Sequence, residues 1–194
     1  MNIFVAGVHG VGKTYLCQHA VSSHGFTHAS ASRLIKEQLA LPEWNANKLV
    51  SDIDGNQLAL IAAIQRYAKA NTPILLDGHF LLRNSADELT EIKTDVFASL
   101  NLSGVILLEN DPQIIRQQIA GRDGIEQSLD ALQAAMDSER SRAEVVCKEL
   151  GLPLNILRAP TEQAFAQAAQ DYFSKSSMRG SQAHGPDAAK NVPS

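Results

Sequence analysis

Eight residues near the start of the chain have the types and spacing of a phosphate-binding loop. Gly7 to Thr14 read Gly-Val-His-Gly-Val-Gly-Lys-Thr, which matches the pattern GxxxxGK[ST] at every fixed position. Glycines allow such a backbone to turn several N–H groups toward one point at the positive end of a helix. We expect Lys13 to reach the β and γ phosphates of ATP and the Thr14 hydroxyl to hold Mg²⁺. The residues predicted to bind the nucleotide are Gly7, Val8, His9, Gly10, Val11, Gly12, Lys13, Thr14 and Tyr15.

The residues around this loop have the patterns of a strand and a helix. An apolar run from Ile3 to Ala6 precedes it, and Tyr15, Leu16, His19 and Ala20 follow at helical spacing. The alternative is a glycine turn followed by Lys and Thr by chance. That alternative has to explain three glycines, a lysine and a hydroxyl at fixed spacing after an apolar strand, so we favour nucleotide binding.

A second candidate site residue closes the apolar run that begins at Ile74. This run ends at Asp77, which is followed by Gly78 and His79. In a parallel sheet such a carboxylate emerges beside the phosphate loop, where it can orient a water on Mg²⁺ or contact a second substrate. The alternative is a cap for the turn at Gly78, and we favour the functional interpretation. Thr14 and Asp77 are therefore the predicted metal side, with Asp77 acting through water.

Apolar runs alternate with helical stretches along the chain, which predicts a three-layer α/β/α fold with a five-stranded parallel sheet. The predicted strands are Asn2 to Ala6, Phe26 to Ala29, Ile74 to Asp77, Val105 to Glu109 and Leu154 to Leu157. The predicted helices are Lys13 to Ser23, Ser32 to Leu39, Gly55 to Ala70, Ala86 to Leu100, Pro112 to Ala120, Ser128 to Leu150 and Glu162 to Ser174. Ala40 to Asp54 has no settled period and is expected to be a mobile connection.

Composition limits the classes of protein that the chain can form. With 194 residues, 44% of them hydrophobic, we expect a single domain over residues 1–174. Residues 175–194 have hardly any large apolar side chain, which predicts a disordered tail. A net charge of −4 disfavours nucleic acid as a partner. The two cysteines form neither a disulfide framework nor a metal site, and no segment is apolar enough to cross a bilayer, so we expect a cytoplasmic protein without membrane contact.

The segment from Leu75 to Phe80 resembles the apolar-apolar-Asp-Gly-aromatic segment of the nucleoside-monophosphate kinases, the adenylate kinase-like branch of P-loop proteins. The resemblance spans most of Met1 to Phe173. It implies ATP and Mg²⁺ as cofactors, an acceptor-side insertion over about residues 30–70 and a short lid over about residues 121–127. In that family a Pro-Arg pair follows and grips the acceptor phosphate. Here the proline is absent and the nearest arginine is Arg83.

The resemblance also implies which residues hold the acceptor. His28 to Lys36 follows the second strand, where these kinases carry a hydroxyl-bearing turn and then a basic residue. Arg33 and Lys36 share a helix face, so they are either acceptor ligands or a solvated surface pair. His79 and Arg83 complete the implied acceptor group.

Arginines are the remaining candidates, because guanidinium groups can follow the charge that spreads over a transferring phosphoryl group. Ile115 to Asp123 is similar to the helix that leads into the family's lid, which makes Arg122 the lid candidate and leaves Arg116 ambiguous. Arg140 and Arg142 stand where the family also has arginines. Because they do not share a helix face, at most one of them is expected to reach the site.

Three functional hypotheses follow. In the first, Lys13, Arg122 and Asp77 serve the transfer of the γ-phosphoryl group of ATP to a small phosphorylated acceptor, most simply a nucleoside monophosphate. In the second, the chain is an ATP-binding switch or ATPase that acts on a protein partner. In the third, it is a kinase whose acceptor is a nucleic-acid end or a non-nucleotide metabolite.

Overall fold

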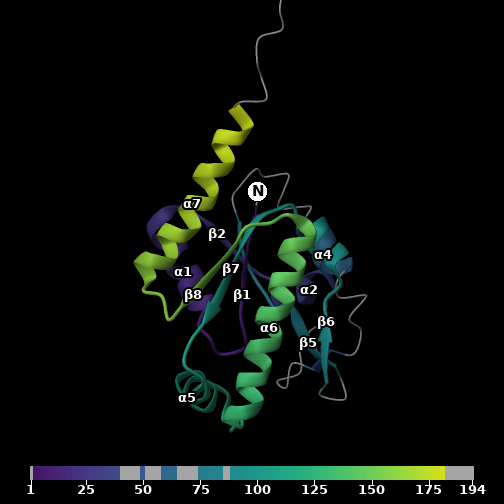
Figure 1. Ribbon diagram of the computed structural model, residues 1–194, viewed down its shortest axis with the longest axis vertical. Coiled ribbons are helices and arrows are strands. Elements are labelled where there is room, and N and C mark those ends of the chain that lie inside the picture. Colours follow the sequence, from purple (N-terminus) through teal and green to yellow (C-terminus); the bar gives the residue numbers. More distant parts are fainter. Residues whose placement is uncertain (1, 40–48, 51–57, 65–73, 85–87, 182–194) are drawn as a thin grey trace, which may run out of the picture.

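The computed structural model describes residues 2–39, 49–50, 58–64, 74–84 and 88–181. Its main sheet has five parallel strands in the order β2-β4-β1-β7-β8 (Figure 1). These strands are β1 (Asn2–Ala6), β2 (Thr27–Ser30), β4 (Ile74–Asp77), β7 (Leu102–Glu109) and β8 (Leu154–Arg158). The predicted fold class is confirmed, and two of the predicted strands, Asn2 to Ala6 and Ile74 to Asp77, have the predicted bounds.

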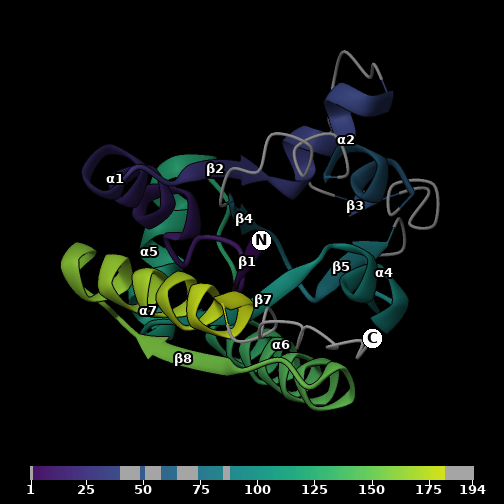
Figure 2. The same cartoon turned by 90° about the horizontal axis from the view of Figure 1, so that it is seen from above.

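Helices cover both faces of this sheet, and β1 shows why. Its five residues are all buried, and the side chains from Ile3 to Ala6 alternate between two apolar clusters. Ile3 and Val5 pack with α1 (Lys13–His24), α5 (Pro112–Asp123) and α7 (Glu162–Ser181). Phe4 and Ala6 pack on the opposite face, where the covering elements are α2 (Ala31–Leu39), α4 (Thr94–Ser99), residues 58–64 and much of α6 (Leu129–Leu150). Figure 2 shows α1 and α7 on one side and α2 and α4 on the other.

A second, smaller sheet was not predicted. It has the order β3-β5-β6 and consists of β3 (Leu49–Val50), β5 (Leu81–Asn84) and β6 (Leu89–Glu91). The predicted helix from Ala86 to Leu100 is confirmed over α4, Thr94–Ser99, but it is wrong for residues 89–91, which pair antiparallel with β5. The backbone N–H of Ile92 donates to the carbonyl of Phe80 at 3.0 Å, so pairing with β5 wins over local helix propensity here.

Other predictions concern segments that the structure describes only in part. The predicted disordered tail is wrong for residues 175–181, which continue α7, since extending a helix already packed on the sheet adds one hydrogen bond for each residue fixed. Residues 182–194 lie outside the described residues, as does most of the connection expected from Ala40 to Asp54. The predicted helix from Gly55 to Ala70 is helical over 58–64, where it is described. No helix in the described parts of the chain combines the length and apolarity needed to span a membrane.

The register of the main sheet brings the two ends of the predicted site together. β1 and β4 are parallel neighbours, and Val5 is paired with Asp77. The phosphate loop leaves the sheet directly after β1, so it emerges at the same sheet edge as the carboxylate that ends β4. This is the edge at which parallel α/β sheets bind ligands.

Candidate active site

The loop from Gly7 to Thr14 joins β1 to the first turn of α1. Gly12 caps α1 with φ of 103°, a left-handed conformation that favours glycine, and a Cβ there would meet no atom within 4 Å. As the N-cap residue, Gly12 makes no side-chain cap bond, and the first turn of α1 contains no acidic residue. The open side of the loop and the helix N-terminus therefore suit a bound phosphate.

Lys13 lies across its own loop. Its side chain is buried, and Nζ donates to the carbonyl oxygens of Gly7 at 2.6 Å and Val8 at 3.1 Å. Nζ also lies 3.4 Å from Nε2 of His79. The ammonium group is thus held between the phosphate loop and the segment after β4, and Lys13 lines the cavity described below.

Asp77 joins the loop to the neighbouring strands. The Thr14 hydroxyl donates to Asp77 Oδ2 at 3.0 Å, and His28 Nε2 lies 2.6 Å from the same oxygen. Burial by itself raises the pKa of this carboxyl, but hydrogen bonding to His28, the charges of His28 and Lys13 and the Thr14 hydroxyl bring the pKa below its ordinary value. Asp77 is therefore ionised at neutral pH.

A hydroxyl beside an ionised carboxylate is a donor set of hard oxygens, which fits Mg²⁺. Thr14 and Asp77 would hold the ion, which would supply positive charge against the phosphates. Within the described residues, no three His, Cys, Asp or Glu side chains gather to form a metal site of their own. Such a sparse set is typical of Mg²⁺, which takes most of its ligands from water and substrate phosphates.

The segment after β4 passes closely over an aromatic cluster. The ring of Phe4 packs edge-on against Phe80 at 5.2 Å and against Phe97 at 5.3 Å between centroids. A Cβ at Gly78 would lie 2.7 Å from the Phe4 ring, so glycine is required for this approach. The cluster fixes the path of the chain from Asp77 toward β5.

Glu139 of α6 also holds this segment, and the sequence analysis did not assign it a role. Its side chain is 3% exposed, and its two carboxylate oxygens accept the backbone N–H groups of Phe80 at 2.8 Å and Leu81 at 3.0 Å. Burial raises the pKa of this carboxyl, while the Phe80 N–H and the charge of Lys13 oppose the rise. Glu139 thus lies between the phosphate loop and the segment that enters β5.

The end of α5 contacts the phosphate loop. His9 Nε2 lies 2.7 Å from Asp123 Oδ2, and Arg122 bonds to both His9 and Asp123. These bonds, led by the one from Arg122, hold the pKa of Asp123 below its ordinary value. Helix α5 extends to Asp123, so the first part of the predicted lid over residues 121–127 is helical. The lid candidate Arg122 therefore lies beside the loop.

Besides Arg122, three arginines were candidates for the lid or the transition state, and the structure does not bring them to the cavity. Arg116 is exposed on α5 and does not line it. Arg140 makes two hydrogen bonds to the carboxylate of Glu109, at 2.7 and 2.6 Å. Arg142 donates to the carbonyl of Ile92 at 2.7 Å and pairs with Glu91 at 3.2 Å. At most one of Arg140 and Arg142 was expected to reach the site, and neither lines the cavity, because protein partners hold both guanidinium groups elsewhere.

One cavity of about 710 Å³ joins these groups. Seven of the nine predicted nucleotide-binding residues line it. Gly7 and Val11 do not line it, and Val11 packs into the core instead. Tyr15 lines it while 62% exposed, and its hydroxyl bonds to Glu162. Asp77 and Arg122 line it too.

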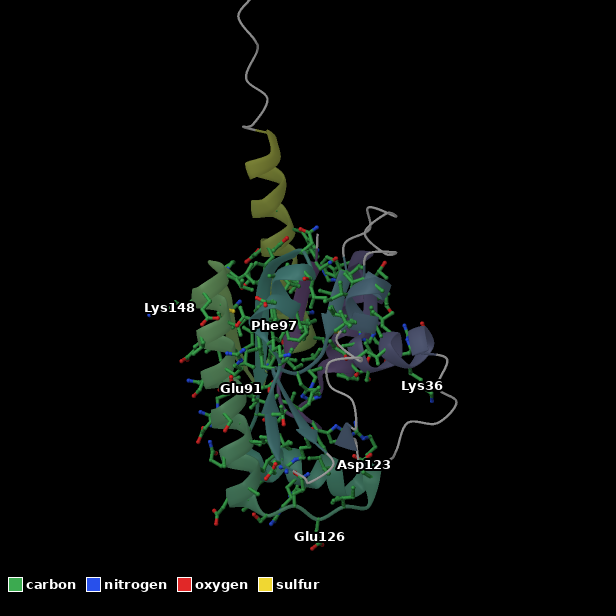
Figure 3. The ribbon with its side chains drawn as sticks, turned by 90° about the vertical axis from the view of Figure 1, so that its right-hand side faces the viewer. Lys36, Glu91, Phe97, Asp123, Glu126 and Lys148 are labelled. Atoms are coloured by element: carbon green, nitrogen blue, oxygen red, sulfur yellow. The ribbon has the colours of Figure 1, made fainter. Side chains whose placement is uncertain are left out.

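All four predicted acceptor residues line the same cavity: Arg33, Lys36, His79 and Arg83. Arg33 is 57% exposed and lies 3.5 Å from Glu37. Figure 3 shows Lys36 of α2 and Asp123 of α5 on the side of the molecule away from α6. The lining of the cavity also includes a set of apolar side chains. We call this set the apolar wall, and it consists of Ile35, Leu60, Leu82, Leu89, Ile92 and Val96.

A phosphate loop after the central strand, an acid at the end of the adjacent strand and a cavity between them define a P-loop protein with the kinase fold. A family model described as AAA domain matches residues 6–135, more than half of the chain. The chain therefore belongs to this AAA domain family. No curated protein matches it.

Solved structures share this fold. A gluconokinase from Sinorhizobium meliloti 1021 superimposes with a TM-score of 0.53 at 18% identity, covering 94% of this chain and 97% of that one. A candidate kinase from Chloroflexus aurantiacus j-10-fl gives a TM-score of 0.51 at 13% identity, covering 88% of this chain and 97% of that one. Both show the fold of P-loop kinases, without singling out the nucleoside-monophosphate branch.

Proposed function

We propose that the protein is an ATP- and Mg²⁺-dependent phosphotransferase that moves the γ-phosphoryl group of ATP to a small acceptor. One observation carries this proposal: a single cavity runs from the phosphate loop to a second group of basic residues. An enzyme that only hydrolyses ATP needs the first group and a water. A second basic group in the same cavity suits a second, anionic substrate.

The residues around the phosphate loop have distinct roles in direct in-line transfer. A bond forms between an acceptor oxygen and the γ phosphorus while the bond from that phosphorus to ADP breaks, and no phosphoenzyme forms. Lys13 and Arg122 would balance the charge on the transferring group, because both line the cavity beside the phosphate loop. Thr14 and Asp77 would serve the metal side.

The lining also bears on the acceptor. Arg33, Lys36 and Arg83 favour an acceptor with an anionic group, and the apolar wall favours one with a planar or apolar body. A nucleoside monophosphate has both features and remains the simplest choice. A sugar acid is the second candidate, because a gluconokinase shares the fold. Several of its hydroxyls would face the apolar wall without partners, at a cost in binding.

The test is a transfer assay with the purified chain, ATP labelled on its γ phosphate, and Mg²⁺. Separate reactions contain nucleoside monophosphates, sugar acids, a 5′-hydroxyl oligonucleotide or no acceptor. We expect one class to become labelled, in step with ADP release, and Lys13→Ala to abolish labelling. ATP binding without transfer to any acceptor would contradict the proposal. Hydrolysis that rises only with an added protein would support the switch instead.

A further inference from the structure

His28 lies against the acid that ends the neighbouring strand. β2 and β4 are parallel, and Ser30 is the register partner of Asp77. Because side chains two residues apart share a sheet face, His28 and Ser30 project from the same side of β2. The His28 ring reaches along this face, and its Nε2 lies 2.6 Å from Asp77 Oδ2. The two side chains are only 10% and 7% exposed.

The carboxylate of Asp77 is therefore held from two sides. The Thr14 hydroxyl approaches Oδ2 from the start of α1, and His28 approaches the same oxygen from β2. Thr14 is itself a predicted metal ligand, so its hydroxyl has to face both an ion and the acid. His28 is not among the predicted metal ligands, so its bond would still hold the carboxylate if the Thr14 hydroxyl turned toward an ion. Hydrogen bonding to His28 also favours the ionised carboxylate against the effect of burial.

We propose that His28 is a positioning residue that holds Asp77 in place for the binding of magnesium and nucleotide. The inference rests on the magnesium–nucleotide binding of the proposed function, but not on transfer to an acceptor. Partners that orient a metal-binding carboxylate change metal affinity by about 10- to 100-fold when they are removed. His28 supplies such a partner from an element outside the phosphate loop.

The experiment compares three substitutions by calorimetry with a non-hydrolysable ATP analogue, in Mg²⁺ and in EDTA. His28→Leu fills similar space without a donor, whereas His28→Gln keeps an N–H donor. His24→Leu is the matched control, because His24 is exposed at the end of α1. We expect His28→Leu to weaken binding about 10-fold or more in Mg²⁺ and less than about twofold in EDTA. His28→Gln and His24→Leu should both stay within about threefold of wild type.

A purely structural histidine gives a different pattern. His28→Leu would then lower thermal stability while its magnesium dependence stays at the wild-type value, and that result would overturn the inference. If His28→Leu does not fold, His28→Asn replaces it, because its shorter amide cannot reach Asp77 from the same backbone position. Wild-type magnesium dependence in a folded His28→Asn chain would equally overturn it. Magnesium-dependent binding without transfer would contradict the proposed function and leave this inference standing.

Discussion

Glu139 connects three segments that meet at the cavity. It belongs to α6, binds the backbone that leads into β5, and lies near enough to Lys13 for their charges to interact. A buried carboxylate that accepts two neighbouring N–H groups fixes the separation between its own helix and the segment that carries them. Glu139 is thus the residue through which the nucleotide side and the acceptor side of the cavity share one support.

The raised pKa of Glu139 predicts a pH dependence of stability. The ordinary pKa of this carboxyl is 4.5, and the folded chain holds the proton more tightly than the unfolded chain. The free energy of unfolding should therefore fall as the pH rises from 4.5 toward the raised value. Glu139→Gln cannot ionise, so this part of the slope should disappear. Loss of one N–H acceptor should also cost about 1–3 kcal/mol.

Urea unfolding of both chains at several pH values between about 5 and 8 measures this difference. All other ionisable groups are common to both chains and cancel in the comparison. Equal slopes for wild type and Glu139→Gln would contradict the prediction.

For single residues, the sequence predicted a role only where the contacting partners lie close together in the chain. The phosphate loop is local, and eight consecutive residues specify its backbone and its lysine. Glu139 and His28 have no such pattern, because their partners lie 59 and 49 residues away. A helical glutamate in Glu139-Arg140-Ser141-Arg142 looks like one more charge on a solvated face. Only the packing of α6 against β5 shows that it is buried.

The last turn of α5 makes a prediction at the scale of the element. It places Arg122 in the cavity and bonds it to His9 of the loop, whereas Arg116 on the same helix is exposed outside it. Arg122→Ala should lower kcat about a hundredfold or more and change ATP affinity little. Arg116→Ala should leave kcat within about twofold of wild type. Steady-state transfer kinetics of both variants measure this contrast. Equal losses in the two would show that charge alone, not position, matters.

Elements that form by local pattern were predicted well, and those that form by pairing were not. The central strands are continuous apolar runs, and α5 begins at Pro112 as predicted, where Asp111 caps it by accepting a bond from Gln113 N. β3, β5 and β6 have only two to four residues each, too few for a period to appear. Residues 89–91 become a strand because β5 offers them partners.

For the whole molecule, the cavity is lined by residues from elements on both faces of the main sheet. A bound nucleotide should therefore stabilise the entire fold. A ligand at about 100 times its Kd adds about 2.7 kcal/mol to the free energy of unfolding. For a chain of this size that is a rise in Tm of about 5–10 °C. Thermal unfolding with ATP and Mg²⁺ should show the rise, and Lys13→Ala should reduce it. An unchanged Tm at millimolar ATP would contradict nucleotide binding.

The alternation of strands and helices predicted the five-stranded parallel sheet with its helical layers, but not the smaller sheet. The sequence could not predict the acceptor in the same way. The cavity wall that faces it combines side chains from α2, β5, residues 58–64 and the segment around α4. No single stretch of sequence contains that combination. Its apolar character became visible only when distant segments were placed together.

The position of β7 has a practical consequence for anyone who shortens this protein. The region matched by the family ends at residue 135, inside α6, whereas β7 needs β8 on its outer side and Tyr172 of α7, whose hydroxyl donates to Val105 O at 3.0 Å. A fragment cut at that boundary would expose the edge of β7 from Val105 to Glu109, which β8 otherwise pairs, and would lack Glu139. Such edges recruit other chains. The fragment should precipitate, so expression boundaries belong beyond the last helix.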